Sequence, residues 1–516
     1  MNLRLVVNQL CALQMVLGVV LLLVAGGFYL VQWFRGEEVN AAAKLALFFV
    51  GGGGLVGAFF VWWMTRPPRG GSEDVGRREA LLLVALSWLL GAGYAALPFW
   101  VWAHLDDAVP PGHPFLNYVD CYFESMSGLT TVGASVLTDI EAVPHALLLW
   151  RAFTQWIGGV GIVVVFIAVL PSVGVGAKRL FFNEVSGPVD EGVMPTIRST
   201  ARVLLQIYSG MTAVLIVALL LCGMSSFDAL CHALSTISTG GFSPKNASTG
   251  HYDSAAVDIV ITIFMILGGV NFALYYHLLR RKYAEVLADR ELRLYFGILA
   301  ACTIVVAAGI VGRVVVKTTG EHVEAGVGYA LQAAVFNVVS VQTTTGFATA
   351  DFDRWPDEVR AVIAFVSILG GCAGSTAGGL KVIRLLIIIK ALMAILERAF
   401  RPSVVRPVRI GRSIVDDEVQ LACMGFAVGM VILHGVGTLL LYVFEPRGTL
   451  DLTTAISANF STFCNTGPGF GKVGPMANYG WMTDGSKITL SMMMLLGRLE
   501  IVTLVALVTP RFWRRV

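Results

Sequence analysis

Long apolar runs alternate with short polar segments along the whole chain. Ten of these runs are long enough for a helix to cross a bilayer, which takes roughly 20 mostly apolar residues. They occupy residues 5–33, 44–65, 80–103, 145–170, 201–223, 255–279, 295–316, 359–397, 418–444 and 486–508. The pattern predicts an all-α polytopic membrane protein with ten spans, of which the eighth is too long for one crossing.

The composition agrees with a membrane protein and excludes other classes. Hydrophobic residues make up 56% of the 516 positions and charged residues only 14%, against about 25% charged in an ordinary soluble protein. The net charge of +3 is too small to indicate nucleic-acid binding. The eight cysteines form no CxxC pair and do not cluster with histidine, so neither a zinc site nor a disulfide framework is indicated.

The first apolar run and the basic residues predict the orientation of the chain. Residues 5–33 exceed the roughly 7 to 15 apolar residues of a secretory signal, so we expect an uncleaved first span. With the N-terminus inside, the inner segments contain more than twice as many Lys and Arg residues as the outer segments. The positive-inside rule therefore predicts that both termini are cytoplasmic.

Four outer loops end in the same small-residue pattern. They read SGLTTVG at 127–133, LSTISTG at 234–240, SVQTTTG at 340–346 and STFCNTG at 461–467. The last glycines of successive loops are 107, 106 and 121 residues apart. A regular period that contains a span, a re-entrant segment and a second span indicates a repeated unit.

The loop pattern suits a pathway for a monovalent cation. Backbone carbonyls can replace the water shell of such an ion without the charge that would trap it, and glycine allows the positive φ values that such a backbone needs. Irregular backbone at membrane depth is tolerated only where protein buries it or it lines a watery cavity. Four such loops therefore predict one shared pore.

Two further features interrupt the apolar runs. Residues 370–379 are rich in glycine and lie in the middle of the eighth run, which predicts a broken helix. Arg498 lies in the last run, where a charge is costly unless it faces a cavity or a partner such as Glu500. Gly374 and Gly379 have the spacing of a phosphate-binding loop, but the residues that follow are Leu380-Lys381-Val382, so nucleotide binding is not expected.

These residues resemble the Trk/Ktr/HKT superfamily of potassium transporters, and the bacterial TrkH type in particular. The resemblance rests on the four loops, on residues 370–381 and on Gly497-Arg498-Leu499-Glu500. It implies an N-terminal two-helix pair and four helix, pore-loop, helix repeats around a pseudo-four-fold pore. The expected domains are 1–70 for the pair, then 71–200, 201–293, 294–412 and 413–516 for the repeats.

The resemblance also implies residue roles. The family's ion filter maps to Thr131, Val132 and Gly133, to Ser238, Thr239 and Gly240, to Thr344, Thr345 and Gly346, and to Asn465, Thr466 and Gly467. Gly133 favours K⁺ over Na⁺, because sodium-selective relatives often have serine there. Asn465 departs from the hydroxyl residues of the other repeats. The implied gate comprises Gly370, Gly371, Gly374, Ser375, Thr376, Gly378, Gly379, Lys381 and Arg498.

The implied function is K⁺ uptake across the bacterial cytoplasmic (inner) membrane, with K⁺ at the filter and no other cofactor. The resemblance further implies a homodimer that binds cytosolic nucleotide-binding Trk-type regulatory subunits. A Na⁺-selective carrier, or H⁺- or Na⁺-coupled symport, is the alternative within the same fold. The basic segment 398–412 could contact the regulatory subunits or anionic lipid, or could only set the topology.

Two other interpretations concern single residues. An intramembrane hydrolase would need Ser375 or Ser235 as nucleophile and His232 or His277 as base, but no span pairs them at a convincing spacing. Asp120 and Glu124 shortly precede the first filter, so they are expected to concentrate cations at the outer mouth.

Overall fold

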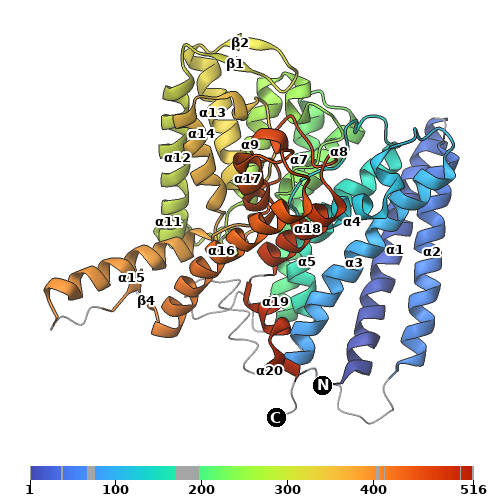
Figure 1. Ribbon diagram of the computed structural model, residues 1–516, viewed down its shortest axis with the longest axis horizontal. Helices are drawn as coiled ribbons and strands as arrows, with labels where there is room; N and C mark the ends of the chain where they lie inside the picture. The colour runs from blue at the N-terminus through green and yellow to red at the C-terminus, as the bar shows by residue number, and fades with distance from the viewer. Residues whose placement is uncertain are drawn as a thin grey trace.

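The computed structural model describes residues 2–36, 39–66, 76–169, 197–402, 407–411, 413–499 and 501–513, and the fold is almost entirely helical (Figure 1). The N-terminal pair and first repeat comprise α1 (Leu3–Arg35), α2 (Ala41–Met64), α3 (Arg77–Leu105), η1 (Pro114–Leu116), α4 (Tyr118–Leu129) and α5 (His145–Val169). The second repeat comprises α7 (Ile197–Leu221), α8 (Ser226–Ile237), η3 (Ser248–Tyr252), α9 (Ala255–Gly268), α10 (Phe272–Leu279) and α11 (Tyr283–Ala288).

The third and fourth repeats follow the same order. The third comprises α12 (Arg290–Ile310), β1 (Val314–Val316), β2 (His322–Glu324), α13 (Val327–Gln342), η4 (Phe352–Arg354), α14 (Asp357–Ile368), α15 (Val382–Phe400), β3 (Arg409–Ile410) and β4 (Ser413–Ile414). The fourth comprises α16 (Asp417–Phe444), α17 (Leu452–Phe463), η5 (Gly471–Val473), α18 (Asp484–Arg498), α19 (Ile501–Val508) and α20 (Pro510–Trp513). The strands form two antiparallel hairpins.

The predicted apolar runs all contain helix, but not all are continuous. Within the described residues, six helices are long and apolar enough to cross a membrane by themselves, namely α1, α2, α3, α7, α12 and α16. The eighth run is broken into α14 and α15, as predicted. The prediction of a continuous helix over 255–279 is wrong, because α9 and α10 meet at 96°. The last run also divides, between α18 and α19.

The break in the sixth run has a local cause. Gly268 and Gly269 end α9, and the side chain of Asn271 then accepts a hydrogen bond from Ala273 N to begin α10. Glycine weakens a helix and asparagine is a strong N-cap residue, so the two together stop one helix and start another. The predicted domain boundaries at 70 and 412 lie outside the described residues, and those at 200 and 293 fall inside the first turns of α7 and α12.

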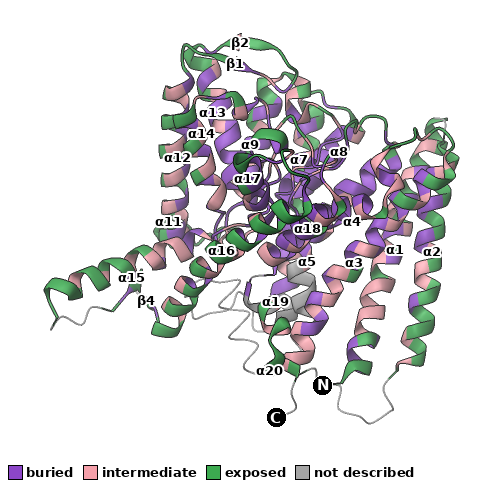
Figure 2. Cartoon of the chain, viewed as in Figure 1, coloured by how far each residue is buried: buried purple, intermediate pink, exposed green. Residues whose placement is uncertain are grey.

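Each repeat holds a short helix between two others. α4, α8, α13 and α17 are 12 to 16 residues long, which is too short to span a bilayer, and most of their residues are buried. Side chains cap three of them, since Asn117, Ser225 and Asp451 each accept a backbone hydrogen bond from the first turn. Figure 2 shows the buried residues gathered around these pore helices and the exposed ones on the outer faces of α1, α2 and α15.

Polar contacts tie the peripheral elements to the repeats. Tyr94 Oη on α3 donates to Val50 O on α2 over 2.9 Å, which fixes the N-terminal pair to the first repeat. At the other end of the molecule, Lys317 Nζ lies 3.0 Å from Asp253 Oδ1 and 2.9 Å from Glu321 Oε2. Hydrogen bonds to both carboxylates raise the pKa of Lys317 to about 12, so this link between the second and third repeats stays charged at neutral pH.

Candidate ion pathway

The chain has the same rare backbone conformation after every pore helix. A residue with a left-handed φ follows each helix, and a glycine with positive φ comes two residues later. The first set is Thr131 (φ 58°), Thr239 (53°), Thr344 (57°) and Asn465 (59°), and the second is Gly133 (84°), Gly241 (77°), Gly346 (84°) and Gly467 (94°). Positive φ is uncommon and strained for threonine, so its recurrence in three repeats, with asparagine in the fourth, indicates one shared geometry.

This geometry corrects the predicted alignment of the second repeat by one residue. The backbone N–H after the left-handed residue donates to a serine carbonyl five residues earlier: Val132 to Ser127, Gly240 to Ser235, Thr345 to Ser340 and Thr466 to Ser461, at 2.8 to 2.9 Å. The equivalents of Thr131, Val132 and Gly133 are therefore Thr239, Gly240 and Gly241. With Gly241 as the last residue, serine precedes the glycine by six positions in every repeat.

Ser238 accordingly occupies the position before the filter segment. Its Oγ donates to Leu234 O over 2.8 Å, as Thr130 Oγ1 does to Met126 O and Thr343 Oγ1 to Val339 O. These hydroxyls bond to the last turns of their pore helices. The prediction chose Gly240 because the sequence has two consecutive glycines there, and only the backbone shows which of them adopts a positive φ.

The four segments close into a ring. A Cβ placed on each of these four positive-φ glycines would collide with a carbonyl oxygen of the next repeat. That oxygen belongs to the residue just before the equivalent glycine. The distances would be 2.3 Å from Gly133 to Gly240 O, 1.9 Å from Gly241 to Thr345 O, 2.2 Å from Gly346 to Thr466 O and 2.6 Å from Gly467 to Val132 O. This order leads from the first repeat through all four and back again, so the segments surround one axis as a pseudo-four-fold ring. The departure at Asn465 leaves this backbone geometry unchanged, and its Nδ2 donates to Thr130 O over 3.1 Å.

Two polar residues of α5, missed as site residues by the sequence analysis, hold the second filter segment. Gln155 is fully buried; its Nε2 donates to Gly240 O over 2.6 Å and its Oε1 accepts from Phe242 N over 3.0 Å. Arg151, one turn earlier, donates to Ser243 O over 3.1 Å. Two polar residues four positions apart within an apolar run would have been the available signal, because residues at that spacing share one helix face.

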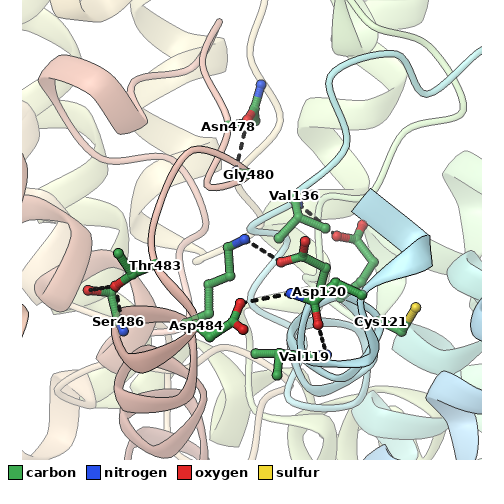
Figure 3. A network of polar contacts seen from close by, with 12 residues as sticks. Val119, Asp120, Cys121, Val136, Asn478, Gly480, Thr483, Asp484 and Ser486 are labelled. Atoms are coloured by element: carbon green, nitrogen blue, oxygen red, sulfur yellow. Dashed lines mark hydrogen bonds and ion pairs between the residues drawn. The ribbon is translucent and has the colours of Figure 1, made fainter. Parts of the chain in front are cut away.

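The outer carboxylates singled out above are buried and paired. Glu124 Oε1 lies 2.6 Å from Arg151 Nε, and its other oxygen accepts from Val136 N over 2.9 Å. Asp120 on α4 pairs with Lys487 on α18, next to Asp484, whose side chain accepts from Asn117 (Figure 3). The expectation that Asp120 and Glu124 attract cations at the mouth is therefore wrong. Glu124 balances the charge of Arg151 within the first repeat, and Asp120 pairs with Lys487 and so joins the first repeat to the fourth.

The intramembrane loop at 369–381 contacts the filter segments. Thr376 Oγ1 lies 3.2 Å from Thr239 Oγ1 in the second repeat, and Gly378 N donates to Thr344 Oγ1 over 2.8 Å in the third. A Cβ on Gly378 would lie 2.5 Å from Cys464 O, so the fourth repeat is also in close contact. The loop thus touches residues at or next to the left-handed position in three of the four repeats.

The remaining predicted gate residues shape this loop. Gly374 and Gly379 have φ values of 70° and 67°, and Ser375 Oγ donates to Cys372 O over 2.6 Å. Gly370 and Gly371 each leave no room for a Cβ, since it would lie 1.9 Å from Gly378 O or 2.6 Å from Gly269 O. Lys381 Nζ donates to Ala377 O. The loop is therefore a compact structure with its own internal bonds.

Arg498 joins the loop to the first repeat. It is only 6% exposed, and its two Nη atoms donate to Thr376 O over 2.8 Å and to Gly158 O on α5 over 2.9 Å. The alternative partner Glu500 lies outside the described residues. A buried guanidinium bonded to two carbonyls keeps its charge beside the loop, because a bond to a neutral carbonyl does not cancel that charge.

A hydrolytic site is not formed by the predicted residues. His232 Nε2 lies 3.1 Å from Ser243 Oγ, and His277 pairs with Glu285. Neither histidine is bonded to Ser235 or Ser375 in the hydrogen-bond network of the described chain. Among the residues that the structure describes, no group of three or more His, Cys, Asp or Glu side chains could hold a metal ion.

Comparison with known proteins agrees with this architecture. The family model TrkH, described as a cation transport protein, matches residues 78–514. The Trk system potassium uptake protein TrkH of Halomonas elongata is 37% identical over 85% of this chain and 86% of its own length. The Escherichia coli K12 protein of the same name is 36% identical over the same shares. The crystal structure of the potassium transporter TrkH from Vibrio parahaemolyticus superposes with a TM-score of 0.83 at 31% identity, covering all of both chains. The chain therefore belongs to the TrkH family of cation transport proteins.

Proposed function

We propose that this protein takes up K⁺ through the ring of four filter segments. The observation that carries the proposal is the closed cycle of glycine-to-carbonyl contacts, because it holds four equivalent backbone segments around one axis. Backbone carbonyl oxygens arranged around one axis replace the water shell of a monovalent ion. The filter comprises Thr131, Val132 and Gly133, Thr239, Gly240 and Gly241, Thr344, Thr345 and Gly346, and Asn465, Thr466 and Gly467. K⁺ binds there as the transported ion, and the names of the relatives support K⁺ as the substrate.

The same proposal assigns the gate to the intramembrane loop and Arg498. The loop contacts residues at or next to three filter segments, and Arg498 on α18 joins it to α5 of the first repeat. A fixed charge in a narrow, poorly hydrated passage repels cations with little screening. The loop adds steric closure to this electrostatic barrier.

Uptake of ⁸⁶Rb⁺ into liposomes that contain the purified protein tests the transport function. We expect uptake that K⁺ competes for more strongly than Na⁺, and no dependence on a proton gradient. Uptake driven equally by Na⁺, or only when a proton gradient is present, would favour the Na⁺-selective or coupled carrier instead.

We further propose that the chain resides in the bacterial inner membrane with both termini inside, as the basic inner segments indicate. A cysteine at Ala108 should react with an impermeant maleimide from outside, and one at Ala284 only from inside; both positions are exposed, between α3 and α4 and within α11. The reagent is applied to intact cells and to inverted vesicles. Labelling of Ala284→Cys in intact cells would contradict this orientation.

The partners are also part of the proposal. We expect a homodimer that binds cytosolic nucleotide-binding regulatory subunits, as the resemblance of the sequence to the Trk-type transporters implies. Exposed basic residues Arg401 and Arg409 follow the end of α15 and suit such a contact. Light scattering of the purified protein measures the dimer, and co-purification of a regulatory subunit with the intact chain measures the complex.

Gln155 gives a prediction about selectivity. Gln155→Leu keeps the volume but removes both bonds to the second filter segment, and each such bond contributes about 1 kcal/mol. We expect the permeability ratio of K⁺ to Na⁺ to fall about threefold to tenfold, measured by competition in the ⁸⁶Rb⁺ assay. Met265→Leu in α9, a buried residue of the corresponding helix in the second repeat, is the control and should keep the ratio. An unchanged ratio in Gln155→Leu would show that α5 does not hold the filter.

A further inference from the structure

Glu291 is a buried carboxylate at the start of α12 to which the sequence analysis assigned no role. It is 6% exposed. Its Oε1 accepts hydrogen bonds from Ala373 N over 2.7 Å and from Ile383 N over 3.0 Å. One oxygen atom on α12 therefore holds two backbone points, one inside the intramembrane loop and one in the first turn of α15.

The bond to Ile383 caps a helix from outside it. α15 begins at Val382, and its own N-cap residue Lys381 makes no side-chain capping bond. The first N–H groups of a helix have no partner within the helix. Glu291 supplies an acceptor for one of them, so the start of α15 is bonded to α12.

The start of α15 is also bonded to the loop, since Val382 N donates to Gly371 O over 3.2 Å. Gly370 N donates to Leu380 O over 2.9 Å and Leu380 N to Ile368 O over 3.0 Å, which closes the base of the loop. Ala373 packs in one hydrophobic cluster with Ile383 and Ile387 of α15. From this base α15 extends away from the rest of the molecule (Figure 1). A displacement of α15 is thus transmitted to the loop unless Glu291 holds both in place.

We propose that Glu291 is a positioning residue of the gate, which locks the intramembrane loop and the first turn of α15 onto α12. The inference rests on the proposed gating function and names the group that restrains it. Breaking the two bonds frees the loop to move with α15, and the filter ring keeps its own contacts. A force applied to the outer part of α15 is then the input that opens the pathway.

The test compares Glu291→Ala with Glu291→Gln in the full-length protein in liposomes. Glutamine retains an uncharged acceptor oxygen for the two N–H groups, whereas alanine retains none. Cys372 next to Ala373 is 1% exposed and reports on the loop, because its labelling by a maleimide requires the loop to leave its place. Labelling is quantified by mass spectrometry of the Cys372 peptide, with fully buried Cys121 as the internal reference.

We expect Glu291→Ala to raise Cys372 labelling at least fivefold and basal ⁸⁶Rb⁺ uptake severalfold, with the K⁺ to Na⁺ ratio unchanged. Glu291→Gln should stay within twofold of the unaltered protein, and Glu285→Ala, which removes an exposed carboxylate on α11, should change neither readout. Glu291→Asp, whose side chain is one methylene shorter, should give intermediate labelling of Cys372. It replaces the alanine variant in the test if that variant does not fold.

The two readouts separate this inference from the gating function. Faster Cys372 labelling with unchanged ⁸⁶Rb⁺ uptake supports the restraint by Glu291 and contradicts the loop as a gate. Unchanged labelling in both the alanine and aspartate variants overturns the restraint, whatever the uptake. Equal labelling of the alanine and glutamine variants also overturns it, because acceptance of the two bonds would then be irrelevant.

Discussion

Arg498→Ala should raise basal ⁸⁶Rb⁺ uptake about tenfold in liposomes that lack any regulatory subunit. The substitution removes both the charge beside the loop and the two bonds that join the loop to α5. Lowering the free-energy barrier by about 1.4 kcal/mol raises the rate tenfold. That energy is small compared with the repulsion that a charge exerts on a cation in a poorly hydrated passage. Selectivity should persist, because the filter ring does not include Arg498.

Deletion of residues 374–378 should have a comparable effect on uptake. It removes Thr376 and Gly378, the residues that contact the filter segments. If Arg498 and the loop form one barrier, the double variant should show less than the product of the two increases. Arg280→Ala, an exposed residue at the end of α10, is the control and should leave uptake unchanged. Thermal unfolding checks that both variants fold normally. If they do and uptake in both is unaltered or lower, the assignment of the loop and Arg498 as the gate is refuted.

Gly133→Ser should lower the K⁺ to Na⁺ permeability ratio about tenfold or more while uptake continues. A Cβ at this position would lie 2.3 Å from Gly240 O, and the φ of 84° is strained for any other residue. Backbone strain of this kind costs of order 1 to 3 kcal/mol, and the neighbouring carbonyl must move to admit the side chain. One quarter of the ring is thereby distorted and the other three contacts remain.

A matched glycine tests whether this effect is specific to the ring. Gly297 on α12 has no atom within 4 Å of its Cβ position, so Gly297→Ser adds the same side chain without a collision. We expect this control to keep the permeability ratio. Gly241→Ser should behave like Gly133→Ser, since its Cβ would lie 1.9 Å from Thr345 O. An unchanged ratio in both ring variants would contradict the assignment of these glycines to the filter.

Several features of the fold could be predicted from the sequence because local properties determine them. A run of about 20 apolar residues forms a helix in a membrane whatever surrounds it, since its backbone must bond internally. Each of the ten predicted runs contains helix, and the glycine-rich middle of the eighth run does break it. The four loops were recognisable from a serine and a glycine at a nearly constant spacing, because that backbone turn requires glycine.

Other features depended on contacts between distant residues. Whether Gly240 or Gly241 has a positive φ is determined by the register of the pore helix and by the neighbouring repeat. The pairing of Asp120 with Lys487 likewise requires elements that are far apart in the chain. A carboxylate attracts cations when it is exposed and balances a cation when it is buried, and the sequence does not state which applies.

The sequence by itself determined the class of the protein, the place of its apolar runs and the presence of four related loops, since each depends on residues close together in the chain. Only the tertiary structure decided how the loops close into one ring and which side chains restrain them. Gln155 and Glu291 act on backbone groups 82 to 92 positions away. Such partners are chosen by the packing of whole helices, which no local pattern encodes.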